Sequence, residues 1–413
     1  MSLGRLRVAF VTGEYVTEEN YSGGLANYIH RLSLSLVQMG HRPLVVIPSD
    51  HDETFVRDGV EIYRVREKRL GFWTRAINTL TGGRYYSTLY FLRRSRLLAA
   101  KVRKLHARDP ISIVQYPHLA GLGIFRPRGI PTVVRLSSYT PLWKVHGEYD
   151  FMDPRMLLEQ ERLERLGLGR ADAVFGPSRA VAAVVEKDIG KPVAVIETPF
   201  LMDTTDLDDS VYRERLQEKA YLLFVGRLSP AKGFVALADA ACAILEKYPD
   251  LFLVIVGREQ GGYKGAPAIE YLRKQAGRCL DRVLYLGDMR HGQLYPIMAN
   301  ARAVTIPSLV ENFPNVCLEA MAHRCVVIGT GGTAFEQLLE DGVSGILCEP
   351  GSPSGLVEAV EKALRLTAAE RERMGEKAAE RIHGLRPEVV VEQLLSFYRG
   401  VMDRSGAGKE GRP

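Results

Sequence analysis

The chain has 413 residues, of which 46% are hydrophobic and 25% charged, a composition typical of a soluble globular protein and not of an intrinsically disordered chain. Its 39 glycines follow no triplet period, which excludes a collagen-like chain, and five cysteines without a C-x-x-C pair exclude a disulfide scaffold. The formal net charge is +6, and the cysteine pattern predicts reduced thiols that act as small buried apolar groups in a cytoplasmic protein.

The first half of the chain alternates short apolar runs with longer helical ones. Buried strands are predicted at residues 7–12, 43–47, 111–116, 132–136, 173–176 and 193–196, with a helix at residues 25–39. This alternation predicts βα units around a parallel sheet, and hence a Rossmann-like domain over residues 1–198. The N-terminal apolar run is too short for a signal peptide, and no segment approaches the roughly 18 to 20 apolar residues that cross a bilayer.

A strongly basic segment lies within this first half. Twelve bases fall between Arg64 and Lys104 against a single acid, so the segment carries +11 and the rest of the chain −5. Aromatic residues are interleaved with the bases, namely Phe72, Trp73, Tyr85, Tyr86, Tyr90 and Phe91. The segment is either a solvated helix face or a surface for a polyanion such as anionic lipid headgroups, which would place the protein on the inner face of the membrane. No nucleic-acid-binding module is recognisable, so no nucleic acid partner is expected.

The second half repeats the alternation after an acidic, aperiodic linker at residues 199–211. Strands are predicted at residues 221–225, 251–256, 283–286, 303–306, 326–329 and 345–348, with helices at residues 234–247 and 314–322. They form a second doubly wound α/β domain over residues 212–385. An amphipathic run predicts a C-terminal helix over residues 386–403 that crosses back to the first domain, and residues 404–413 are expected as a disordered tail.

Loops in the second half carry polar residues at the ends of predicted strands, the edge where open α/β sheets bind ligands. Gly226 allows a turn after one strand, and Arg227 and Lys232 then flank a helix start, an arrangement that suits a diphosphate. Glu311 follows another strand and Glu319 lies eight residues on, and two carboxylates suit a ligand rich in hydroxyls. The plainer interpretations are a surface loop for the segment with Arg227 and Lys232, an exposed loop acid for Glu311 and a buried helix carboxylate for Glu319.

The order of these motifs resembles a known family. The set GR-x4-KG, a loop ending LG, PS-x2-E-x-F-x5-E-A-M-A and GGT is similar to the donor-binding domain of the retaining glycosyltransferases of family 4. Glu311 and Glu319 match the family's paired acids, spaced E-x7-E. The resemblance implies the GT-B fold, with two Rossmann-like domains and the active site in the cleft between them.

The resemblance also implies roles for single residues. Arg227 and Lys232 would hold the diphosphate of a nucleotide-sugar donor and stabilise it as leaving group. Glu319 would bind the ribose, and Glu311 with neighbouring backbone amides would grip the donor hexose. The remaining donor-binding residues would be Gly23, Gly24, Gly226, Gly287, Met289, Phe313, Pro314, Asn315 and Val316.

The sequence departs from the family pattern in the first domain. Many relatives carry a histidine near the reacting centre, but residues 133–138 contain none, and His118, one strand earlier, is either a catalytic substitute or a structural residue. The usual hinge Asn-Gly is absent, and Asn312 replaces a common glycine after the first acid.

The leading hypothesis is therefore a metal-independent, cofactor-free retaining glycosyltransferase. It would move a hexose from a UDP- or GDP-sugar to a lipid-linked acceptor or a bacterial surface glycan precursor. The alternatives are a GT-B-fold sugar-nucleotide epimerase and a non-catalytic nucleotide-sugar-binding protein.

Overall fold

The computed structural model describes residues 4–18, 24–67, 79–80, 85–149, 152–202, 204–259, 262–263 and 266–407. The chain forms two compact units, the first from residues 1–141, 152–199 and 386–413, the second from residues 142–151 and 200–385. Residues 142–151 thus depart from the sequence prediction, which assigned residues 1–198 to one domain. They group with the second unit, where Glu148 contacts Arg227 and Ser229.

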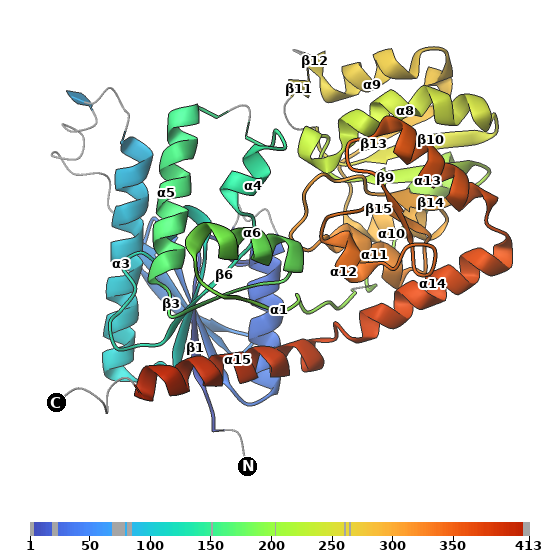
Figure 1. Cartoon of the computed structure of the whole chain (residues 1–413). Helices are drawn as coiled ribbons and strands as arrows, with labels where there is room; N and C mark the ends of the chain where they lie inside the picture. Colours follow the sequence, from blue (N-terminus) through green and yellow to red (C-terminus); the bar gives the residue numbers. More distant parts are fainter. Residues whose placement is uncertain are drawn as a thin grey trace. The chain divides into compact units, whose positions relative to one another are not determined.

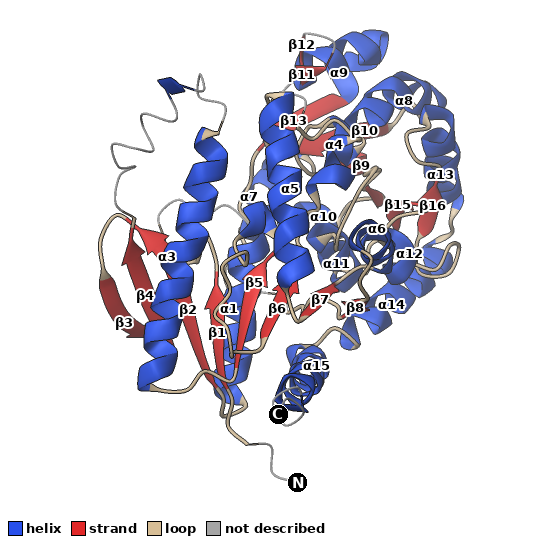
Figure 2. Cartoon of the chain, turned by 60° about the vertical axis from the view of Figure 1, so that its left-hand side comes forward, coloured by secondary structure: helices blue, strands red, loops and turns tan. Residues whose placement is uncertain are grey.

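The first unit is built on an eight-stranded sheet in the order β3-β4-β2-β1-β5-β6-β7-β8 (Figures 1 and 2). The strands are β1 (Arg7–Val11), β2 (Arg42–Ser49), β3 (Glu53–Arg57), β4 (Val60–Arg66), β5 (Ile113–Pro117), β6 (Thr132–Arg135), β7 (Ala173–Gly176) and β8 (Val193–Val195). Neighbours pair in parallel except at β3, which is antiparallel to β4. β1 is buried along its whole length, which explains its nearly continuous apolar sequence, since a central parallel strand is covered on both faces.

Helices and the chain's C-terminal segment complete the first unit. They are α1 (Gly24–Gln38), α3 (Tyr86–Arg108), α5 (Pro154–Arg170), α6 (Arg179–Ile189) and α15 (Pro387–Ala407), and a short α4 (Thr140–Lys144) leads into the second unit. α15 lies beside α1 (Figure 1) and shares a core with it. Its Tyr398 hydroxyl donates to Gln115 Oε1 of β5 at 2.5 Å. The helix continues to Ala407, past the predicted end at residue 403, and residues 408–413 of the predicted tail lie outside the described residues.

The second unit is built on a six-stranded, wholly parallel sheet in the order β13-β10-β9-β14-β15-β16. The strands are β9 (Ala220–Val225), β10 (Leu251–Val256), β13 (Val283–Gly287), β14 (Ala303–Thr305), β15 (Val327–Thr330) and β16 (Ile346–Cys348). The helices are α7 (Ser210–Arg215), α8 (Phe234–Lys247), α9 (Ala268–Ala276), α10 (His291–Ala299), α11 (Asn315–Ala322), α12 (Phe335–Leu338), α13 (Pro353–Arg365) and α14 (Ala368–His383). A small hairpin, β11 (Gly262–Tyr263) and β12 (Ala266–Pro267), precedes α9.

Apolar helix faces cover both sides of this second sheet. Leu237 of α8, Leu272 of α9 and Val360 of α13 share one core cluster, and residues of α10, α11 and α12 share another. In the described part of the chain, no helix is both long and apolar enough to span a membrane.

Candidate functional site

The path of the chain through the second sheet reverses between β9 and β14. β9, β10 and β13 spread to one side, and β14, β15 and β16 to the other. The loops after β9 and β14 therefore meet at a topological switch point on the carboxyl edge of the sheet, where open α/β sheets bind ligands. The Leu309 N–H donates to the Ala231 carbonyl at 2.9 Å and fastens the two loops together.

Glycine makes this close approach possible. Gly233, between the short 3₁₀ turn Pro230–Lys232 and α8, has a φ of +69°, and a Cβ there would lie 1.8 Å from the Pro307 carbonyl oxygen. Only glycine satisfies both the left-handed backbone and the contact. The GR-x4-KG motif therefore sets the start of α8 directly against the loop that carries Glu311.

Lys232 and Glu311 form an ion pair at the switch point. Lys232 Nζ lies 2.5 Å from Glu311 Oε1, and the two side chains are 20% and 9% exposed. A carboxylate this buried requires a charged or hydrogen-bonding partner. The structure thus brings together the predicted diphosphate cation and the predicted hexose carboxylate, and a polar ligand entering here would exchange contacts with both.

Arg227 has a partner that the sequence did not reveal. Its guanidinium forms an ion pair with Glu148, whose side chain is 6% exposed and whose Oε2 also accepts from the Ser229 hydroxyl at 3.3 Å. Glu148 comes from residues 142–151, far from Arg227 in the chain. No local motif marks it, because its relevance depends entirely on this long-range contact.

Glu319 lies in α11 and is 6% exposed. Its Oε1 is 3.4 Å from Nε2 of His291, at the first position of α10, and that histidine is largely exposed. Burial lowers the pKa of the neighbouring His323, and the negative charge of Glu319 offsets part of this lowering. The buried carboxylate therefore has an accessible imidazole beside it at the same edge of the sheet, and His291 is a further residue that the sequence analysis missed.

The other predicted donor residues of the second unit occupy the same series of loops. Gly287 ends β13 with a φ of +77°, and Met289, Phe313 and Val316 pack partly buried against one core cluster. Pro314 is buried and precedes α11, whose first residue Asn315 is exposed. In the GGT loop after β15, Glu336 accepts from the Gly332 N–H at 2.6 Å, which holds that loop in place.

The candidates of the first unit have a different setting. Gly23 lies outside the described residues, and Gly24 opens α1. His118 follows β5, and its side chain is fully buried. Its Nδ1 accepts from the Ser137 N–H at 3.1 Å and its Nε2 contacts the Ser138 carbonyl, while burial lowers its pKa. The neutral ring thereby fixes the loop that follows β6.

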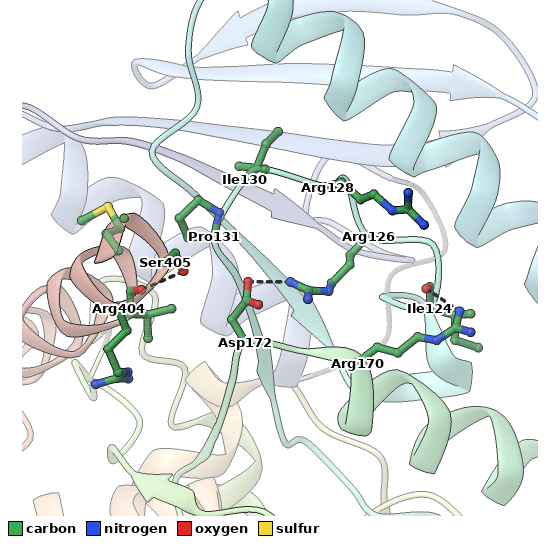
Figure 3. Close-up of a pocket in the computed structure, with 13 residues that line it drawn as sticks. Ile124, Arg126, Arg128, Ile130, Pro131, Arg170, Asp172, Arg404 and Ser405 are labelled. Carbon is green, nitrogen blue, oxygen red and sulfur yellow. Dashed lines mark hydrogen bonds and ion pairs between the residues drawn. The ribbon is translucent and has the colours of Figure 1, made fainter. Parts of the chain in front are cut away.

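A broad pocket in the first unit contains none of the predicted site residues. It has a volume of about 1240 Å³ and lies beside Pro131 and Asp172, which precede β6 and β7, at the amino edge of the sheet (Figure 3). Asp172 pairs with Arg126, and Arg170 donates to the Ile124 carbonyl at 3.1 Å. Because α5 and α15 both end here, the basic residues suit the negative ends of two helix dipoles. Packing and helix termini thus account for this pocket.

Each of the two units matches a family of known proteins. Residues 210–381 match the family model described as glycosyl transferases group 1, and residues 23–197 match that of a glycosyl transferase 4-like domain. The phosphatidyl-myo-inositol mannosyltransferase of Mycobacterium leprae is 32% identical over 182 residues, 44% of this chain and 46% of that protein. The alpha-D-kanosaminyltransferase of Streptomyces kanamyceticus is 27% identical over 313 residues, 71% of this chain and 76% of that protein. The chain spans about half the length of the mycobacterial relatives that it matches.

Solved structures resemble the chain over nearly its whole length. Sucrose-phosphate synthase from Thermosynechococcus elongatus aligns with a TM-score of 0.71 at 18% identity, covering 97% of this chain and all of that one. The Anabaena protein HepE in complex with UDP and glucose aligns with a TM-score of 0.65 at 17% identity, covering 96% and 100%. At these identities the likeness establishes a shared fold.

Proposed function

The chain belongs to glycosyltransferase family 4 and has the GT-B fold, and we propose that it transfers a hexose from a nucleotide-diphosphate donor with retention of anomeric configuration. The observation that carries the proposal is the Lys232–Glu311 pair at the switch point of the second sheet. It combines the cation that a diphosphate requires with a carboxylate suited to sugar hydroxyls. The bound UDP in the structure of HepE supports a nucleotide donor.

The cations provide the chemistry at the leaving group. Departure of a nucleoside diphosphate builds negative charge on the phosphates, and fixed cations stabilise this charge without reorganisation. Lys232 stands at the start of α8, and Arg227 at the beginning of the same loop forms an ion pair with Glu148. In the proposal both side chains contact the diphosphate, and neither requires a metal ion for that role.

The two acids have separate tasks in the proposal. Glu319, fixed in α11, accepts hydrogen bonds from the ribose, while Glu311 leaves Lys232 and binds hydroxyls of the donor hexose. This exchange couples sugar binding to phosphate binding, because the Lys232 ammonium that Glu311 releases becomes free to contact the diphosphate. Both carboxylates are buried, and a buried carboxylate needs polar partners. This supports a role for both in ligand binding, in place of simple exposure to solvent.

A lipid-linked acceptor is supported by the first unit and by one relative's name. The Mycobacterium leprae relative is named for phosphatidyl-myo-inositol, a phospholipid. On this chain, α3 has no acidic residue, and Arg96, Arg103 and Lys104 are exposed on it. A cationic helix face is suited to anionic headgroups, so the proposed acceptor is presented at a membrane surface.

The stereochemistry of the reaction tests the proposal. The full chain is first screened by thermal shift with UDP, GDP and ADP, since a ligand that binds the native state raises its melting temperature. The matching nucleotide-sugar is then incubated with the protein, and the anomeric configuration of the released or transferred sugar is followed by proton NMR. Retention supports the proposal and inversion contradicts it. An epimerised sugar without retained transfer would indicate an epimerase, and binding without turnover a non-catalytic binding protein.

A further inference from the structure

Two cysteines of the second unit lie side by side although 37 positions separate them in the chain. Cys242 lies in α8 and Cys279 in the 3₁₀ segment Gly277–Arg282, and their Sγ atoms are 3.7 Å apart. Glu246, one helical turn after Cys242, places its Oε1 3.1 Å from Cys242 Sγ. The ligand atoms of these three residues all lie within 4.8 Å of one another. The sequence analysis predicted reduced thiols that act as small buried apolar groups, and no metal ligands, because no spacing in the sequence joins these residues.

The distances fit a tetrahedral soft-metal site. Two thiolates bound to one zinc ion at 2.3 Å lie about 3.8 Å apart when the geometry is tetrahedral, close to the observed separation. A disulfide would instead require the sulfurs to approach to about 2.05 Å. Cys242 and Glu246 stand at i and i+4 on one helix face, a spacing that lets two side chains of a helix reach a common ligand.

The surroundings hold these side chains in place. The Arg282 guanidinium donates to the carbonyls of Leu245 at 2.6 Å and Tyr248 at 3.1 Å, which fastens the 3₁₀ segment to the end of α8. Arg278 forms an ion pair with Glu246. Hydrogen bonds of this kind orient ligating carboxylates in metal sites, and the arginine charge offsets part of the negative charge of two thiolates and a carboxylate.

The site is open to solvent on one side. Cys279 is buried, whereas Cys242 is half-buried and Glu246 is 39% exposed. We propose that Cys242, Cys279 and Glu246 bind one zinc ion, with a water molecule in the fourth position. On binding, the two thiol protons pass to solvent. The ion would join α8, the helix that begins at the proposed diphosphate site, to the segment that leads into β13.

Metal binding to the reduced, metal-free full chain tests this site. The expected result is one equivalent of zinc by competitive titration, one equivalent of cadmium with a thiolate-to-cadmium charge-transfer band, and a melting temperature that rises with zinc. Cys242→Ala removes the band and the thermal shift. Glu246→Gln keeps the thiolates but weakens zinc binding by about tenfold or more.

Cys348→Ala is the matched control, because Cys348 is a buried thiol of the same unit and is not one of the three residues whose ligand atoms come together. This variant retains full zinc binding. Cys242→Ala changes a half-buried thiol, so its fold can be verified by circular dichroism before titration. The proposal is overturned if the reduced wild-type chain binds no zinc, or if Cys242→Ala binds as much as wild type. A Cys242–Cys279 disulfide that forms under mild thiol oxidation, with no zinc binding after reduction, would establish a redox pair in place of a metal site.

Discussion

Lys232 is a single side chain on which we expect both turnover and stability to depend, because the proposal places it at the diphosphate and because it neutralises the buried Glu311. In Lys232→Ala we expect the loss of about 2 to 4 kcal/mol of transition-state stabilisation, the scale of a lost oxyanion donor. Folding should lose about 1 to 3 kcal/mol, since the carboxylate is left without its partner. Steady-state kinetics and denaturant unfolding measure the two effects separately.

The double variant Lys232→Ala/Glu311→Gln distinguishes these effects. Removing the unpaired charge should restore most of the stability, because a neutral amide is less costly to bury than a carboxylate. Turnover should stay low, since the Lys232 cation is not restored and Glu311 is also lost as a ligand of the hexose. Recovery of turnover along with stability would show that Lys232 acts only as a structural counter-ion and that Glu311 does not bind the hexose.

Glu319 and Glu311 are expected to differ in which part of the donor they bind. Glu319→Gln should weaken binding of the free nucleoside diphosphate, because the α11 carboxylate is assigned to the ribose. Glu311→Gln should leave that binding largely unchanged and lower sugar transfer. Calorimetric titration with the nucleoside diphosphate alone measures the difference, and an equal loss of affinity in both variants would exclude the assignment.

What the sequence could predict of the site depended on spacing along the chain. Arg227, Lys232, Glu311 and Glu319 belong to compact motifs at strand ends, and the structure places all four in loops or helices at one edge of the sheet. The partners of these residues could not be predicted in this way. Glu148, His291 and the Cys242–Cys279 pair gain meaning only from contacts between distant segments, which no local pattern encodes.

At the scale of elements, the alternation of apolar and helical runs predicted the parallel strands because central strands are buried on both faces. The β3–β4 hairpin was missed for the opposite reason. β3 is an edge strand whose residues are mostly exposed, so it has no apolar face. The Asp58-Gly59 turn, with positive φ at both residues, was the available signal, since this dipeptide is typical of tight hairpins.

The start of α8 depends on Gly233. Gly233→Ala adds a Cβ that would lie 1.8 Å from the Pro307 carbonyl oxygen, at a φ of +69°. The left-handed backbone strain alone costs about 1 to 3 kcal/mol. Because the two loops must also separate, we expect the free energy of unfolding to fall by more than this strain. Chemical denaturation measures it.

Gly342→Ala, in the loop between α12 and β16, is the control for this variant, because Gly342 has a φ of +74° but nothing within 4 Å of its added Cβ. It should show the backbone strain alone. If the two variants lose equal stability, the close approach of the loops after β9 and β14 does not constrain the fold.

At the scale of the whole molecule, the basic charge is distributed differently from what the sequence suggested. Within the described residues, Arg64 pairs with Glu18 and Glu53, and Arg94 pairs with Glu67. Of the interleaved aromatics, Tyr86 is 48% exposed, while Phe72 and Trp73 lie outside the described residues. Part of the predicted positive patch is therefore neutralised within the fold, and its remaining described charge is concentrated on α3.

The exposed face of α3 forms a single cationic stripe. Its buried side chains are Ser95, Leu98, Ala99, Val102 and Leu105, while Arg96, Arg103, Lys104 and Arg108 are exposed on the other side. The Lys101 ammonium instead lies 5.0 Å from the ring centroid of Tyr63 in β4. From Arg96 to Arg108 this stripe extends about 18 Å along the helix axis. A stripe of one sign and this length is the part of the first unit best suited to contact an anionic surface.

The triple variant Arg96→Gln/Arg103→Gln/Lys104→Gln tests this contact. Each base near an anionic surface contributes about 1 kcal/mol, so the variant should lose roughly 3 kcal/mol, or about a hundredfold, in binding to anionic vesicles at low salt. Co-sedimentation with phosphatidylserine-containing and neutral vesicles measures it, and high salt should release the wild type because the attraction is screened within about 8 to 10 Å.

The control Arg155→Gln/Arg179→Gln/Lys187→Gln removes the same charge from exposed positions of the same unit outside α3. Equal losses of binding in the two variants would mean that net charge, and not the α3 face, governs binding. If the wild type does not bind anionic vesicles at low salt, α3 is a solvated helix face.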